Sequence, residues 1–113
     1  MGETEKEVVW LHERITTPPF SDQARNKAGG FIRQLQEGEW LSLPVSRPMP
    51  AIGPRCHELR INDDGHAWRI VYRIDPGHIV VAAVFPKKTQ ETPEFVKASC
   101  RARLRQYDIE LRG

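Results

Sequence analysis

Two short turn signals divide the middle of the chain into three strand-like runs, and this division limits the possible folds more than any other feature. The runs are 57-HELRI-61, 67-AWRIVYRI-74 and 78-HIVVAAVF-85, and the signals between them are 62-NDDG-65 and 75-DPG-77. Asn, Asp, Pro and Gly are the residues that tight turns favour. Because consecutive strands joined by short turns pair antiparallel, we predict an antiparallel meander. The last run is apolar on both faces, so we expect it inside the sheet.

The segments before this meander add a strand and a helical region. The run 7-EVVWLHERI-15 favours a strand, and apolar residues recur at helical spacing from Phe20 to Leu35, after a plausible cap at Ser21. The pair Gly29–Gly30 weakens that region, so one bent helix or two short helices are both possible. Residues 43–54 hold four of the nine prolines and are expected to form neither a helix nor a central strand.

The chain closes with a second helical segment. Thr92 is a plausible cap, Pro93 suits the first helical position, and an apolar stripe follows. We therefore predict a single α+β domain over residues 1–113: a small twisted, mainly antiparallel sheet with N-terminal helices packed on one face and a C-terminal helix, the helices sharing one face of the sheet. The stripe consists of Val96, Cys100, Leu104 and Tyr107.

Composition excludes several classes of protein. The chain has 113 residues, 28% of them charged and 39% hydrophobic, which is typical of one globular domain. No apolar run approaches the roughly 20 residues that cross a bilayer. Cys56 and Cys100 are too far apart to form a metal-binding pair, so we expect free thiols, a cytoplasmic location, and neither metal nor cofactor. A pI near 8.7 is below that of a dedicated nucleic-acid binder.

The basic residues are more informative than the net charge of +2. Period-two alternation turns Arg69 and Arg73 away from the core side of their strand, and Arg60 of the neighbouring strand turns the same way. We expect an exposed basic face, which suits phosphate because the planar guanidinium donates paired hydrogen bonds. The ordinary alternative is solvated arginines whose stems cover apolar surface. The complete basic cluster is Arg55, Arg60, Arg69, Arg73, Lys87 and Lys88.

Three further features are weaker candidates for functional residues. Lys97, Arg101 and Arg105 are spaced along one side of the last helix and suit either solvent or an acidic partner. His57 opens an arginine-bearing strand and titrates near neutrality, although a plain edge histidine is the usual alternative. Tyr107 suits the core or a catalytic contact.

Three segments together resemble a known family. The stretch 55-RCHELRINDDGHAWRIVYRID-75, followed by 84-VFPKKTQETP-93 and a helix ending near Tyr107, resembles the RelE/HigB-type toxins of bacterial toxin–antitoxin pairs. It is more similar still to the phage-derived branch of the RelE/ParE superfamily, whose pattern is E-L-R-I, an aromatic-Arg strand, then F-x-K-K-T-x-x-T-P. The upstream segments 18-PPFS-21 and 38-GEWLSLP-44 also fit that branch, so the likeness covers nearly the whole chain.

This resemblance implies a ribosome-dependent endoribonuclease, an mRNA interferase that needs no metal. In such toxins the 2′-hydroxyl of the RNA attacks the adjacent phosphate, which requires a base, cationic donors and an acid. Arg60, Arg69, Lys87 and Lys88 match motif positions that face the substrate. His57, Lys87 and Tyr107 stay open as proton-transfer groups.

The resemblance also implies partners. We expect messenger RNA, the ribosome and a helix-turn-helix antitoxin, with no membrane contact. Residues expected to bind RNA outside the catalytic set are Arg55, Arg73, Arg101 and Arg105. Two alternatives share the scaffold: a ParE-like toxin that poisons DNA gyrase, and an inactive module that binds an antitoxin.

Overall fold

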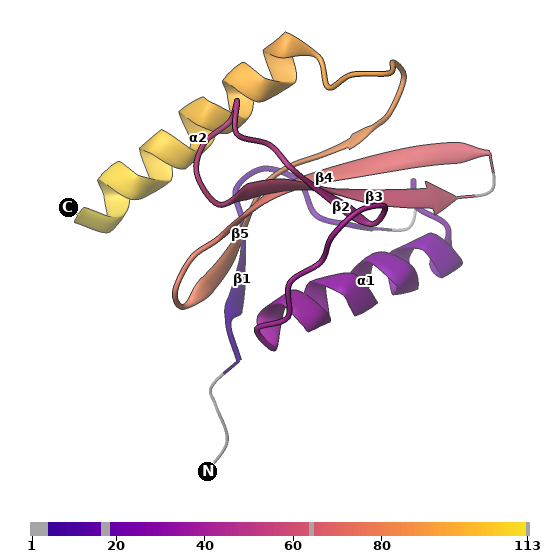
Figure 1. The fold of residues 1–113 in the computed structure, drawn as a ribbon, viewed down its shortest axis with the longest axis horizontal. Coiled ribbons are helices and arrows are strands. Elements are labelled where there is room, and N and C mark those ends of the chain that lie inside the picture. Colours follow the sequence, from indigo (N-terminus) through magenta and orange to yellow (C-terminus); the bar gives the residue numbers. More distant parts are fainter. Residues whose placement is uncertain (1–4, 17–18, 64, 113) are drawn as a thin grey trace.

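The computed structural model describes residues 5–16, 19–63 and 65–112, and these form a five-stranded sheet between two helices (Figure 1). The strand order is β1-β5-β4-β3-β2. β1 is parallel to β5, and every other neighbouring pair is antiparallel, so the sheet is mixed. The elements are β1 (Glu7–Trp10), α1 (Asp22–Gln36), β2 (Ser46–Pro48), β3 (Cys56–Asp63), β4 (His66–Ile74), β5 (His78–Pro86) and α2 (Glu94–Arg112).

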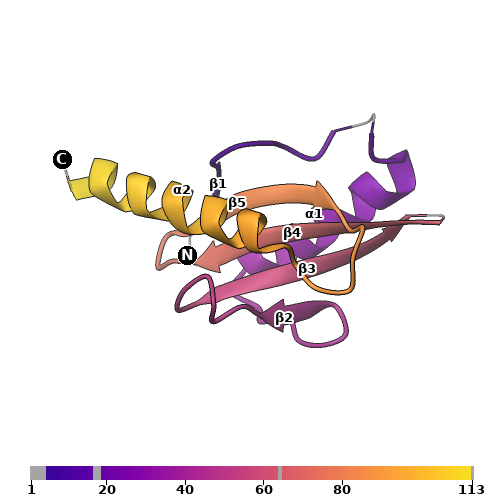
Figure 2. The ribbon, with the colours of Figure 1, turned by 90° about the horizontal axis from the view of Figure 1, so that it is seen from above.

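The predicted meander is present as β3, β4 and β5, but the predicted fold class is wrong in two respects. A single helix, α1, precedes the meander in the described residues, where several N-terminal helices were expected. The two helices also lie on opposite faces of the sheet instead of sharing one; α2 lies in front of the sheet in Figure 2 and α1 lies behind it. The physical reason is β5, which is apolar on both faces and therefore needs cover on both.

Helix α1 starts where a serine satisfies its first free amide. The Ser21 hydroxyl accepts a hydrogen bond from the Ala24 amide at 3.0 Å, which confirms the predicted cap. The same hydroxyl donates to Asp63 Oδ1 at 2.6 Å and so joins the start of α1 to the end of β3. Gly29 and Gly30 lie at exposed positions, where the helix continues unbroken. Residue 64, part of the predicted turn signal 62-NDDG-65, lies outside the described residues.

Two apolar clusters fill the two faces. Against α1, the sheet packs residues such as Leu59, Ile70 and Tyr72, all at most 1% exposed. Against α2, it packs Val71, Val80 and Ala82. The predicted stripe of α2 forms the helix side of the second cluster, with Cys100 and Leu104 buried and Val96 and Tyr107 packed at its edge.

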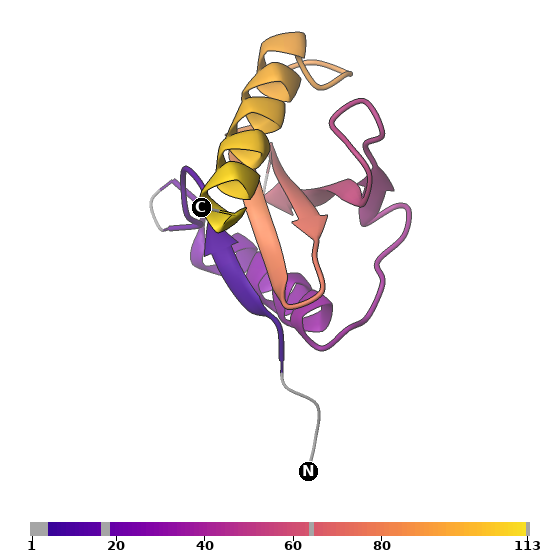
Figure 3. The same ribbon diagram turned by 90° about the vertical axis from the view of Figure 1, so that its left-hand side faces the viewer.

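Helix α2 runs along β5 (Figure 3), but it does not begin as the sequence predicts. The Thr92 hydroxyl donates to the Glu58 carboxylate instead of capping the helix. The Pro93 carbonyl accepts from the amides of Val96 and Lys97 at 3.1 and 3.2 Å and closes the first turn. In the described part of the chain, neither helix is both long and apolar enough to cross a membrane.

The exposed glycines of α1 generate a test of this fold. Gly29→Ala should raise the free energy of unfolding by about 0.5–1 kcal/mol, because an added Cβ meets nothing within 4 Å and alanine loses less backbone entropy on folding. Denaturant unfolding measures the change. Gly38→Ala is the matched control and should destabilise the protein, since Gly38 has a φ of +94°. A loss of stability in Gly29→Ala would contradict a single continuous α1.

Candidate functional site

Arg60, Arg69 and Arg73 lie on one face of the sheet, as alternation predicts, but α2 packs on that face. Arg60 is directly opposite Arg69, and Cys56 is opposite Arg73, so these side chains project together. Arg69 and Arg73 are 7% and 8% exposed. The expectation of an exposed arginine face is therefore wrong for both. Each needs acidic partners, because an unpaired buried charge is very costly.

Glu58 provides the acidic partner for Arg69. Its carboxylate is 1% exposed and lies 3.7 Å from Arg69 Nε and 3.5 Å from Arg47 Nη2. Its second oxygen accepts the hydroxyl of Thr92. Strands β2, β3 and β4 and the segment before α2 therefore meet at one carboxylate.

The guanidinium of Arg69 keeps its positive charge although its surroundings disfavour the charged form. Burial lowers the pKa of Arg69 below that of a free guanidinium, and the nearby cations Arg60 and Arg47 add to this, while the negative charge of Glu58 opposes it. A guanidinium nevertheless stays protonated in proteins. Its Nη1 also donates to the Trp68 carbonyl at 3.0 Å, so the group is held in one orientation.

A cavity of about 380 Å³ opens beside this pair, between the end of β5 and the start of α2. Glu58 and Arg69 line its wall, and so do Lys87 and Lys88, which the sequence placed at the end of the last strand. None of the ion pairs among the described residues uses either lysine. The cavity therefore combines a fixed guanidinium with two lysines that have no acidic partner in this part of the chain.

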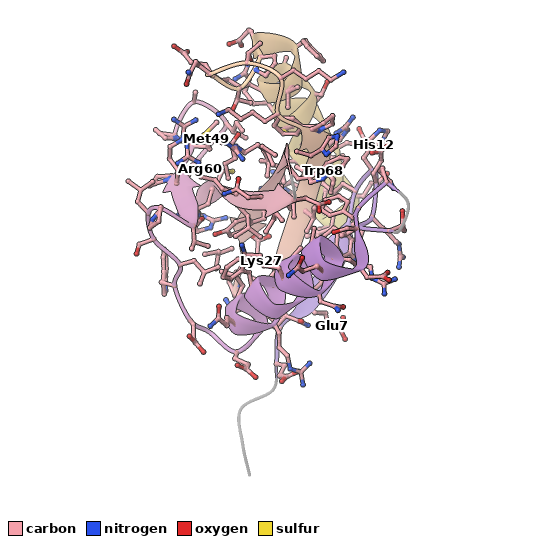
Figure 4. All side chains as sticks on the ribbon, turned by 90° about the vertical axis from the view of Figure 1, so that its right-hand side faces the viewer. Glu7, His12, Lys27, Met49, Arg60 and Trp68 are labelled. Atoms are coloured by element: carbon pink, nitrogen blue, oxygen red, sulfur yellow. The ribbon has the colours of Figure 1, made fainter. Side chains whose placement is uncertain are left out.

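Arg60 is the cross-strand neighbour of Arg69 but is not among the residues that line this cavity. It is partly buried, and its Nε has no hydrogen-bond partner within the described residues. In Figure 4 it lies well away from α1, which carries Lys27. Arg60 contributes positive charge to the surroundings of Arg69.

Arg73 has a different environment from Arg69. Its guanidinium donates to both Asp75 oxygens at 2.8 Å and to both Asp108 oxygens at 3.0 and 2.7 Å. These bonds raise the pKa of Arg73, and the same contact lowers the pKa of Asp108. Through these four hydrogen bonds to two carboxylates, Arg73 anchors α2 to the end of β4.

The four residues expected to bind RNA gather in a second hollow. This hollow has a volume of about 400 Å³ and lies further along α2, where Asp108 also lines it. Arg69 and Arg73 are four residues apart on β4, about 13 Å along a strand, so the two hollows are separate. The four residues are Arg55, Arg73, Arg101 and Arg105.

Two candidates for proton transfer do not join the cavity. His57 is 8% exposed on the α1 side, where its ring stacks on Tyr72 with 5.5 Å between centroids. Burial lowers the pKa of His57, which keeps the ring neutral near pH 7. Tyr107 packs beside Arg73 and Asp75, where burial raises its pKa. Of the three groups left open by the sequence, Lys87 alone lines the cavity with Arg69.

Sequence reasoning missed three contributors to this site. Arg47 lies on β2, an edge strand hidden within the proline-rich segment. Thr92 resembled a helix cap, and its hydroxyl instead serves Glu58. Phe95 lines the cavity although it is off the apolar stripe of α2, and that position of a large apolar residue was the signal that the sequence offered.

Comparison with protein families identifies the class of protein to which this fold and cavity belong. The chain belongs to the phage-derived Gp49-like protein family (DUF891), whose model matches residues 19–105, most of the chain. This is a family of toxin–antitoxin toxins related to RelE-like proteins, which confirms the predicted resemblance at that level and implies an antitoxin partner. No curated protein matches the chain.

The buried carboxylate makes a specific prediction for stability. Glu58→Ala should lower the free energy of unfolding by about 3–5 kcal/mol, because it leaves the Arg69 guanidinium buried and unpaired. Denaturant unfolding measures this loss. Glu94→Ala removes the carboxylate of the exposed Arg101–Glu94 pair and should change stability little. Similar small effects for both variants would show that Glu58 does not hold Arg69.

Proposed function

We propose that this chain is the ribonuclease toxin of a toxin–antitoxin pair and that it cleaves messenger RNA on the ribosome without a metal ion. The observation that carries the proposal is the cavity that Arg69, Lys87 and Lys88 line together beside the buried Glu58. Family membership supports it, since Gp49-like toxins are generally ribonucleases.

The proposed reaction uses the RNA as its own nucleophile. The 2′-oxygen bonds to the adjacent phosphorus, the bond from phosphorus to the 5′-oxygen breaks, and a 2′,3′-cyclic phosphate and a 5′-hydroxyl result. A base in the cavity takes the proton of the 2′-hydroxyl, and an acid in the same cavity gives a proton to the leaving 5′-oxygen. Lys87 and Lys88 fill these two roles in our proposal.

Arg69 is assigned to the phosphate. Charge builds up on the phosphate oxygens in the transition state, and a donor that is already oriented stabilises it without reorganisation. The Glu58 carboxylate and the Trp68 carbonyl hold the guanidinium in place. Partial burial strengthens such an interaction, because the local dielectric constant is low. Glu58 is a positioning residue in this scheme.

The ribosome supplies what the cavity lacks. In-line attack requires the 2′-oxygen, the phosphorus and the leaving oxygen to be aligned, and free RNA rarely holds that geometry. We therefore propose that the decoding site presents the messenger RNA in the required conformation. The proposed antitoxin is a small helix-turn-helix protein, which would prevent this encounter.

The cavity lysines provide the functional test. Expression of the wild-type chain without an antitoxin should arrest growth with loss of translation, and Lys87→Ala/Lys88→Ala should abolish the arrest. Arg25→Ala/Lys27→Ala is the matched control, because it removes two positive charges from α1, on the opposite face of the sheet. Growth curves and incorporation of labelled methionine measure both effects.

Each other result has a definite meaning. A DNA-damage response in place of translation loss would favour a gyrase poison, and normal growth with the folded wild-type chain would favour an inactive antitoxin-binding module. Purified protein should cut messages that are being translated much faster than the same RNA alone. Equal rates on the two substrates would contradict the ribosome-dependent mechanism.

A further inference from the structure

Phe95 has a large apolar side chain that is exposed to solvent at the edge of the basic cavity. It is 74% exposed, although most large apolar side chains of the sheet faces are buried. Its residue lines the same cavity as Arg69, Lys87 and Lys88. It also borders the neighbouring hollow that His12 helps to line, so the ring stands between two depressions of the surface.

The packing of α2 fixes this exposed position. Val96 and Cys100 turn into the cluster between α2 and the sheet, which leaves the adjacent Phe95 pointing outward. Arg101 donates to the Ala51 carbonyl and to Glu94, both at 2.8 Å, and so ties the first turns of α2 to the loop after β2. A rigid element therefore presents the ring beside the cations.

We propose that Phe95 is a stacking platform for a base of single-stranded RNA whose phosphate is bound by Arg69, Lys87 and Lys88. This inference rests on the proposed function and adds the feature of the substrate that the chain recognises. Single-stranded RNA is commonly held by cations that follow the backbone and by aromatic rings that receive unstacked bases. An exposed ring beside three cations meets both requirements within one cavity.

Stacking can be separated from a general apolar contact by the shape of the substituent. Leucine retains apolar surface but has no flat face for a base, whereas tryptophan has a larger flat face. Phe95→Leu should therefore behave like Phe95→Ala if a base stacks there. It should behave like the wild type if the ring merely contacts an apolar patch on a protein.

The experiment measures binding apart from cleavage. The purified full chain is titrated into a fluorescent single-stranded oligoribonucleotide in which every 2′-hydroxyl is methylated, so that the RNA binds without being cut. Fluorescence anisotropy should show binding about 10-fold weaker for Phe95→Ala and Phe95→Leu, and wild-type or tighter binding for Phe95→Trp. Leu111→Ala is the matched control: Leu111 is 64% exposed on the last turn of the same helix, and its variant should bind as the wild type does.

Several outcomes would overturn the inference. Unchanged binding by Phe95→Ala, or wild-type binding by Phe95→Leu, would rule out stacking, and so would failure of the wild type to bind the RNA. Thermal melts should coincide for all variants, since the ring is exposed. The growth assay with the lysine variants judges the proposed function separately, so arrest that depends on the lysines together with unchanged binding by Phe95→Ala would reject stacking and retain the ribonuclease.

Discussion

The Glu58 carboxylate connects four separate parts of the chain, and the shape of the candidate site depends on it. Arg47 from β2, Arg69 from β4 and Thr92 from the segment before α2 all reach this one group on β3. A carboxylate that is 1% exposed needs such partners, because its charge has lost contact with water. Because Thr92 lies between β5 and α2, the same contacts fix the path of the segment that joins them, and this segment forms part of the cavity wall.

A second buried cluster at the other end of β4 completes the attachment of α2. Arg73 binds Asp75 on its own side of the sheet and Asp108 on the helix. The cations of the chain are therefore divided between two kinds of role. Arg73 is committed to the fold, whereas Lys87 and Lys88 line a cavity and take part in none of the ion pairs among the described residues. Arg69 belongs to both groups, since it is paired with Glu58 and lines the cavity.

Much of the fold could be predicted because local patterns decide it. The turn signals and alternation predicted β3, β4 and β5, and the hydroxyl at Ser21 predicted the start of α1. The number of N-terminal helices was misjudged because Gly29–Gly30 lowers helix propensity by an amount that packing of one helix face easily offsets. The placement of the helices was predicted wrongly for a different reason. Because β5 is apolar on both faces, the sequence predicted a central position for it in the sheet, which is correct. The same apolar character also requires a helix on each side of the sheet, and this was missed.

The sequence by itself determined which side chains share a face, since period-two alternation is a property of the strand backbone. It also determined the family, because the family is identified from short sequence motifs. Tertiary structure alone decided which cations are buried and paired, because Asp108 meets Arg73 from 35 residues away and Thr92 meets Glu58 from 34. It likewise separated His57 and Tyr107 from the cavity that Lys87 lines. Contacts between distant residues depend on how α2 crosses the sheet, and no local pattern encodes that crossing.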